Sequence, residues 1–253
     1  MAAGVLTGCG SKGSDKTFTV GFDAEFPPYG YRDDNGEYVG FDLDLAQEVC
    51  DRLDWTLVKQ PIDWDAKDME LDSGAIDCIW NGFTMNGRED DYTWSDPYVD
   101  NSQVMVVSEN SGINSLSDLA GKTVGVQAAS AALDLLQSEE EGGQKELADT
   151  FAALQQFPDY NNAFVELQAG SIDAVAMDIG VAKYQLESRG EGYKILDEHL
   201  NSEKYAIGFK KGNTELCDKV NEGLQQVLAD GTFDKLAEKY GIADMVCLEK
   251  KGE

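Results

Sequence analysis

Hydrophobic and polar positions follow two different periods in the first third of the chain. A β-rich run, TFTVGFD at residues 17–23, ends in a carboxylate, and FDLDLAQEVCDRL follows at residues 41–53. In the second stretch Leu45 and Val49 recur at helical spacing behind a polar Asp42. The pattern predicts a strand and then an amphipathic helix with Asp42 as its N-cap.

The same pattern continues and then restarts in the second half. DMELDSGAIDCIWNG at residues 68–82 predicts the end of a helix, a glycine stop and a strand. Residues 122–130, KTVGVQAAS, repeat the Thr-Val-Gly of the first strand, and residues 161–178, NNAFVELQAGSIDAVAMD, repeat the helix, glycine and strand. Because each half holds parallel βαβ units, we expect an α/β protein with two mainly parallel sheets, each flanked by helices.

Polar side chains stand at the expected carboxyl ends of strands in both halves. They are Asp23 and residues 81–84 in the first half, and residues 127–130 and Asp178 in the second. Ligands of open α/β sheets bind beyond the carboxyl ends of their strands. Two such sets, one from each half, predict a cleft between two lobes.

Two extended segments connect the halves. SQVMVVSE at residues 102–109 precedes the second half, and EKYAIGFKKG at residues 203–212 follows it, before two closing helices. Paired crossings of this kind predict a hinge about which the lobes close on a ligand. The pattern alone leaves open which lobe the closing helices join.

Composition narrows the possible functions. The 253 residues carry a formal net charge of −28, which would repel nucleic acid phosphates. No run of eighteen apolar residues predicts a membrane-spanning helix. Neither a paired-cysteine motif nor a His/Cys spacing predicts a metal or other cofactor, and the single His199 gives little scope for histidine catalysis.

One of the five cysteines lies close to the start of the chain, and the other four lie in the region that is expected to fold. Leu-Thr-Gly-Cys at residues 6–9 resembles the lipobox of bacterial lipoproteins, so we expect a truncated leader over residues 1–16 and lipidation of Cys9; the alternative is a tail with a chance cysteine. Cys217 and Cys247 form a candidate disulfide for an oxidising compartment. Cys50 and Cys78 fall at apolar positions and are expected as buried thiols.

Several motifs in order resemble one known family. They are FDAEFPPYGY, GEYVGFDLDLAQEV, NGFTMNGRE, WSDPY, GKTVGVQ, QFPDYNNAFVELQAGSIDAVAMD and ADGTFDKLAEKYG. The chain is similar to the solute-binding proteins of ABC importers for polar amino acids, which have the two-lobed, type II periplasmic-binding-protein fold. The resemblance implies that residues 17–103 with 208–253 form lobe 1 and that residues 104–207 form lobe 2, with hinge strands at its two ends.

The resemblance also implies how an amino acid backbone is held. Arg88 takes the place of an arginine whose planar fork binds the ligand's α-carboxylate, with Thr84 and Ser130 donating to the same group. Asp178 takes the place of the carboxylate that receives the α-ammonium. The spacing departs from the family at one point, because Thr84 and Arg88 lie one residue closer together than in relatives.

A second set of residues would surround the ligand's side chain. Its members are Asp23, Glu25, Phe26, Trp64, Asn81, Gly82 and Gln127. Two facing carboxylates would favour a basic ligand such as arginine or lysine over glutamine or cystine, with cation–π contact from Trp64. Two alternatives stay open, since Glu25 could face solvent, and Trp64 and Phe26 could serve core packing.

The resemblance implies a monomeric binding protein, not an enzyme, that delivers its ligand to the permease subunits in the membrane. It would be exported and lipid-anchored outside the cytoplasmic membrane, or periplasmic. The alternatives are an enzyme like the cyclohexadienyl dehydratases of the same fold, with Glu25 or Asp178 as general acid, and an amino-acid sensor domain.

Overall fold

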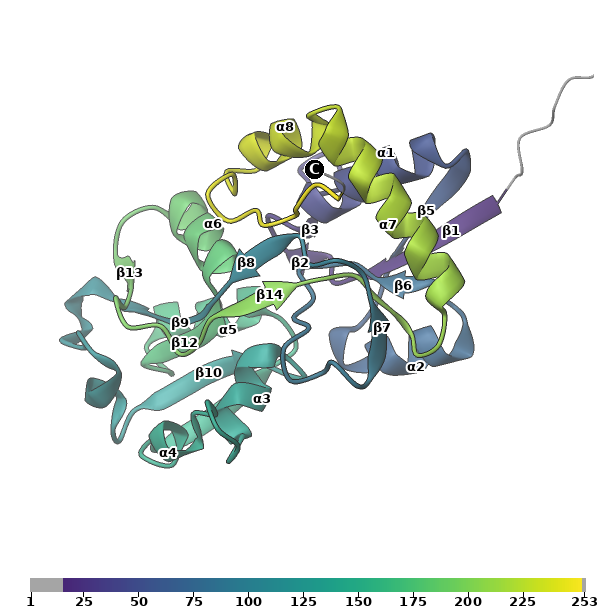
Figure 1. Ribbon diagram of the computed structural model, residues 1–253. Helices are drawn as coiled ribbons and strands as arrows, with labels where there is room; N and C mark the ends of the chain where they lie inside the picture. The colour runs from purple at the N-terminus through teal and green to yellow at the C-terminus, as the bar shows by residue number, and fades with distance from the viewer. Residues whose placement is uncertain (1–15, 252–253) are drawn as a thin grey trace, which may run out of the picture.

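The computed structural model describes residues 16–251, which fold into two lobes around one central sheet each (Figure 1). The first sheet has the strand order β5-β1-β6-β15-β7, formed by Trp55–Pro61, Lys16–Phe22, Cys78–Ile79, Gly208–Lys210 and Tyr92–Trp94. The second has the order β11-β10-β12-β9-β13, formed by Ala153–Phe157, Thr123–Gln127, Ala174–Asp178, Gln103–Ser108 and Tyr193–Ile195. Short strands β2, β3 and β4 form a separate small sheet from Glu25–Phe26, Gly30–Arg32 and Tyr38–Val39.

Both central sheets have a parallel core, as the repeated βαβ pattern predicts. Strand β1 pairs parallel to β5 and β6, and β10 pairs parallel to β11 and β12. The antiparallel members, β15 and β9, are the strands that follow the crossings between the lobes. The α/β class and the two-lobed architecture are therefore confirmed.

Helices cover both faces of each sheet. The first lobe carries α1 (Phe41–Arg52), α2 (Lys67–Ser73), α7 (Thr214–Ala229) and α8 (Thr232–Lys239). The second carries α3 (Ala131–Gln137), α4 (Lys145–Ala148), α5 (Tyr160–Ala169) and α6 (Ile179–Arg189). Short 3-10 turns occupy Trp64–Ala66, Glu109–Ser111 and Leu116–Leu119. On β6, Cys78 belongs to the apolar cluster that includes α1 and α7, whereas Ile79 packs with Leu71 of α2. This alternation explains why a strand covered on both faces is apolar throughout.

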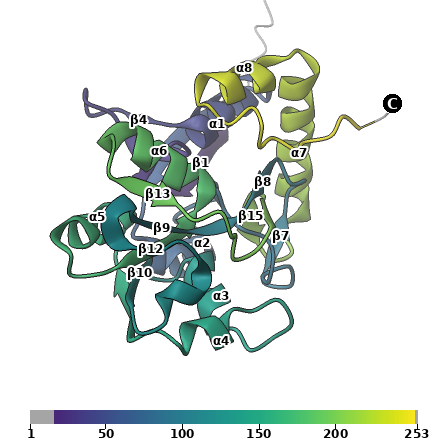
Figure 2. The same ribbon diagram turned by 90° about the vertical axis from the view of Figure 1, so that its left-hand side faces the viewer.

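The crossings between the lobes contain a pair of strands, but the first of them precedes the predicted segment 102–109, most of which forms β9 of the second sheet. Strands β8 (Val99–Asn101) and β14 (Glu203–Tyr205) pair antiparallel, directly before β9 and before β15. Figure 2 shows α7 and α8 beside α1, on the side of the molecule away from α3 and α4. We therefore retain residues 17–103 with 208–253 as the proposed lobe 1 and residues 104–207 as the proposed lobe 2.

Two local predictions were wrong. The first helix begins with Gly40 as its N-cap, and Asp42 lies buried in the first turn, where its Oδ2 accepts hydrogen bonds from the Gly82 amide and the Tyr98 hydroxyl. The predicted disulfide between Cys217 and Cys247 is also absent, since both are free thiols. The Cys217 thiol instead donates a hydrogen bond to the carbonyl of Trp94, 3.2 Å away inside lobe 1.

None of the helices in residues 16–251 combines the length and apolar character that a membrane crossing requires. The predicted lipidation site, Cys9, lies outside the described residues. Within the described part of the chain, no group of three or more His, Cys, Asp or Glu side chains has the arrangement of a metal site.

Candidate functional site

A cavity between the lobes is strongly acidic. It encloses about 640 Å³ and is lined from lobe 1 by residues 23–25 and 61–65 and by Glu70, and from lobe 2 by Ala128 and residues 158–159. Six of its lining residues are carboxylates: Asp23, Glu25, Asp63, Asp65, Glu70 and Asp159. Among residues 16–251, no lysine, arginine or histidine lines it. Such a wall attracts cations and repels anions.

Three of the predicted side-chain contacts, Asp23, Glu25 and Trp64, line this acidic cavity. The Asp23 carboxylate accepts hydrogen bonds from the backbone amide of Glu25 at 2.8 Å and from Gln127 Nε2 of lobe 2 at 2.7 Å. Burial raises the pKa of Asp23 to about 6, although these hydrogen bonds oppose the shift. The hydrogen bond from Gln127 to Asp23 thus links the two lobes next to the cavity that Asp23 lines.

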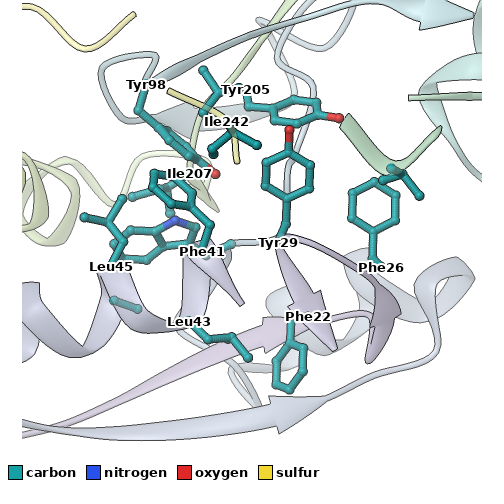
Figure 3. Packing of buried hydrophobic residues seen from close by; sticks show 14 of the residues in the cluster. Phe22, Phe26, Tyr29, Phe41, Leu43, Leu45, Tyr98, Tyr205, Ile207 and Ile242 are labelled. Atoms are coloured by element: carbon teal, nitrogen blue, oxygen red, sulfur yellow. The ribbon is translucent and has the colours of Figure 1, made fainter. Parts of the chain in front are cut away.

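The two predicted aromatic contacts do not face each other. Phe26 is buried, and its ring packs against Tyr29 and Tyr160 at centroid distances of 5.9 and 6.0 Å. Figure 3 shows the rings of Phe26, Tyr29 and Tyr205 next to one another. Trp64 is half-buried and meets Phe83 edge-to-face at 5.6 Å. Phe26 therefore belongs to the core between the lobes, while Trp64 combines packing with exposure to the acidic cavity.

Arg88 lines a second cavity of about 340 Å³, and residues of both lobes form its wall. Its guanidinium forms an ion pair at 2.6 Å with Asp134 of α3, a side chain that is 59% exposed. The shortened spacing does not prevent Arg88 from reaching the other lobe. Its cation also lies 5.3 Å from the centre of the Phe83 ring, a cation–π geometry.

Three predicted site residues lie in the segment that follows β6: Asn81, Gly82 and Thr84. Gly82 has a positive φ of 56°, and a Cβ there would meet the rings of Phe26 and Tyr205 at 2.9 Å, so the turn requires glycine. Asn81 is buried, yet neither its side-chain oxygen nor its nitrogen has a hydrogen-bond partner. An unsatisfied amide of this kind is costly unless a further group pairs with it.

Asp178 ends β12 and is buried in a network of neutral donors. Its Oδ1 accepts from Tyr205 at 2.6 Å, from Gln103 at 2.7 Å and from Asn101 at 2.9 Å, and its Oδ2 accepts from Tyr160. Burial, together with the nearby carboxylate of Glu203, raises the pKa of Asp178 to about 6.

Ser130 is the N-cap of helix α3. Its hydroxyl accepts from the Leu133 amide and donates to the Gln127 carbonyl at 2.8 Å, at the start of α3. The preceding Ala129 has a positive φ of 53°, which is uncommon for a residue with a Cβ and turns this segment sharply. The structure thus places Ser130 at the interface between the lobes but with its hydroxyl already bonded.

Sequence reasoning missed Lys67 and Glu203. Lys67 is only 5% exposed, and its Nζ lies 3.3 Å from the Ala129 carbonyl of lobe 2 and 5.3 Å from the Trp64 ring. Burial lowers the pKa of Lys67, and Arg88 lowers it further. Glu203 is 3% exposed and accepts from Thr84 Oγ1 at 2.7 Å. A charged residue opening the extended segment at 203–212 was the available signal for Glu203.

Comparisons with known proteins agree on one family. The family described as bacterial extracellular solute-binding proteins, family 3, matches residues 18–243. The chain is 28% identical to the L-cystine-binding protein TcyJ of Escherichia coli strain K12, over 90% of this chain and 84% of that protein. It is 30% identical to the arginine-binding extracellular protein ArtP of Bacillus subtilis strain 168, over 93% and 92% of the two chains.

Solved structures give the same result. An ABC uptake transporter substrate-binding protein from Streptococcus pneumoniae, with bound histidine, superposes with a TM-score of 0.86 at 34% identity, covering 92% of this chain and 95% of that one. An ancestral amino acid-binding protein, AncCDT-1, described as a precursor of cyclohexadienyl dehydratase, has a TM-score of 0.79 at 30% identity, covering 88% and 95%.

Proposed function

The chain belongs to family 3 of the bacterial extracellular solute-binding proteins, and on this basis we propose that it captures a basic amino acid for an ABC importer. The observation that carries the choice of ligand is the acidic cavity between the lobes, along whose wall the described part of the chain places six carboxylates and no cationic side chain. Arginine, lysine or ornithine would place a side-chain cation there. Glutamine and cystine rank behind them, and an acidic ligand would be repelled.

The backbone of the ligand would be held by charges from the two lobes. We propose that Arg88 releases Asp134 to bind the α-carboxylate, because a ligand carboxylate enclosed by both lobes is less hydrated than the exposed Asp134. Asp178 would receive the α-ammonium. The unpartnered amide of Asn81 would supply a further polar contact. The hydroxyls of Thr84 and Ser130 would do so by leaving their present acceptors, Glu203 and the Gln127 carbonyl.

The proposed cycle is binding and delivery without chemical change. The lobes close about the β8–β14 pair, water leaves the cleft, and the closed form is presented to the permease subunits. We propose that the protein acts as a monomer, tethered through Cys9 to the outer face of the cytoplasmic membrane. Incubation with prephenate or arogenate is expected to yield no aromatic product, and formation of one would support the dehydratase alternative instead.

Calorimetric titration of the purified protein with L-arginine, L-lysine, L-glutamine and L-cystine tests the proposed ligand class. We expect the basic amino acids to bind at least about tenfold more tightly than glutamine, which corresponds to about 1.4 kcal/mol of charge interaction inside a cleft. In the Glu25→Gln, Asp159→Asn double variant this preference should shrink, with glutamine affinity unchanged. The Glu109→Gln variant removes an exposed charge elsewhere and serves as control. Tighter binding of glutamine or cystine by the wild type would contradict the proposed preference.

A further inference from the structure

Two buried carboxylates share the same hydrogen-bond donors in the hinge. Asn101 Nδ2 lies 2.9 Å from Asp178 Oδ1 and 2.7 Å from Glu203 Oε1. Gln103 Nε2 lies 2.7 Å from the same Asp178 oxygen and 2.8 Å from the same Glu203 oxygen. Asp178 and Glu203 are 4% and 3% exposed. The two carboxylate oxygens therefore converge on one pair of amide groups.

In residues 16–251, only neutral side chains donate hydrogen bonds to this carboxylate pair. Within residues 16–251, no lysine, arginine or histidine forms a salt bridge with either carboxylate. In addition, the side-chain oxygens of Asn101 and Gln103 are buried without any hydrogen-bond partner, and these residues are 3% and 0% exposed. Buried carboxylates are normally paired, and buried amide oxygens are normally bonded. What the described residues do not supply to the cluster is a single positively charged group that carries several N–H donors.

An ammonium ion has both properties. Glu203 lines the same cavity as Arg88, so a carboxylate acceptor and a guanidinium donor border one space of about 340 Å³. Thr84, a proposed contact of the ligand's backbone, already donates its hydroxyl to Glu203 Oε1. We infer that Glu203 is a second acceptor for the α-ammonium of the amino acid ligand, acting together with Asp178. This inference rests on the proposed function and adds a residue to it.

Glu203 lies on a hinge strand, so an interaction between Glu203 and the ligand would couple binding to the position of the hinge. Glu203 begins β14 and pairs with Asn101 of β8 in the backbone ladder, whereas Asp178 ends β12 of lobe 2. An ammonium shared by the two carboxylates relieves their mutual repulsion only while hinge and lobe 2 stay together. The ligand thereby stabilises the closed arrangement, and a ligand without an amino group would lack this effect.

Paired titrations with L-arginine and its des-amino analogue, 5-guanidinopentanoate, test the inference. The Glu203→Gln variant keeps the side chain's size and removes its charge. We expect it to bind L-arginine about 10- to 100-fold more weakly, the range for a hydrogen bond to a charged group, and to bind the des-amino analogue as the wild type does. Asp100→Asn, which removes an exposed carboxylate from the adjacent hinge strand, should change neither affinity. An equal loss for both probes would show a merely structural role and overturn the inference.

The wild type provides a second test that does not depend on the variant's folding. Near pH 5.5, arrival of an ammonium should expel a proton from Asp178, whose pKa is raised to about 6, and calorimetry detects this by comparing buffers of different ionisation enthalpy. Proton release is expected with L-arginine and not with 5-guanidinopentanoate; equal release with both contradicts the inference. A wild type that binds none of the four amino acids named above overturns the proposed function, and this inference with it. A wild type that binds L-arginine while Glu203→Gln binds it equally well overturns the inference alone.

Discussion

The guanidinium of Arg88 contacts the carboxylate of Asp134 at 2.6 Å, and this ion pair joins the turn after β6 to helix α3 of the other lobe. The arginine side chain is 12% exposed and the aspartate side chain 59% exposed, so the pair lies at the rim of the cleft. The cation that we assign to the ligand's carboxylate is thus occupied by a carboxylate of the protein. Binding requires an exchange of one for the other, which leads to the first two predictions.

Replacing Asp134 with Asn should strengthen ligand binding. The variant removes the competitor for Arg88, and an exposed ion pair contributes about 0.2–1 kcal/mol, so affinity for L-arginine should rise by a factor of about 1.4 to 5. Isothermal titration measures the change. Asp149→Asn, which breaks an exposed ion pair with Lys145 in the same lobe, is the matched control. Weaker binding by Asp134→Asn would mean that Asp134 supports the ligand site instead of competing for it.

Replacing Arg88 with Ala should weaken binding strongly without unfolding the protein. Loss of a charge-assisted pair to the ligand carboxylate is expected to cost about 2–3 kcal/mol, or roughly a hundredfold in affinity. The melting temperature of the ligand-free variant should stay within a few degrees of the wild type. Arg32→Ala, at an exposed arginine bonded to the Gly36 carbonyl, controls for general loss of charge. Normal binding by Arg88→Ala would disprove the carboxylate assignment.

Affinity should depend on pH below about 6. Burial, with a contribution from Glu203, raises the pKa of Asp178 to about 6, and an ammonium pairs with the ionised form. Below that value a growing share of the free protein is protonated, so the dissociation constant for L-arginine should rise by up to tenfold per pH unit, and above pH 7 it should level off. Titrations from pH 4.5 to 8 measure this, with Asp178→Asn as comparison. A flat profile in the wild type would argue against Asp178 as the ammonium acceptor.

The same raised pKa has the opposite effect on the stability of the ligand-free protein. Because Asp178 binds a proton more tightly when folded than when unfolded, its favourable contribution is complete below pH 4 and is lost as the pH rises through 6. A ligand ammonium offsets this loss. The stabilisation by L-arginine, measured as a shift in melting temperature, should therefore be larger at pH 7.5 than at pH 5.

Cys217 and Cys247 should both be recovered as thiols. Burial raises the pKa of each to about 11, which keeps the reactive thiolate scarce in the folded state. We expect slow alkylation of the native protein and complete alkylation of both residues after unfolding without reductant, as read by peptide mass spectrometry. A peptide in which Cys217 is linked to Cys247 would restore the disulfide that the sequence suggested.

Local patterns predicted the secondary structure well. The βαβ units, the stop at Gly74 and the two closing helices are all present, because helical and strand periods follow from which face each element buries. The prediction that Asp42 is the N-cap was wrong, because the Asp42 carboxylate accepts hydrogen bonds from Gly82 and Tyr98, which are remote in the sequence. A side chain's partner was predictable where the partner is local and unpredictable where it is not.

The sequence by itself determined the α/β class, the two-lobed arrangement and the polar residues at the strand ends, since each of these depends on periodicity and order along one chain. Only the tertiary structure decided which charges meet. The Arg88–Asp134 pair, the carboxylates around the acidic cavity and the convergence of Asp178 with Glu203 join segments far apart in the sequence. Electrostatic interactions depend on distance and burial in space, and neither quantity is encoded in the spacing of residues along the chain.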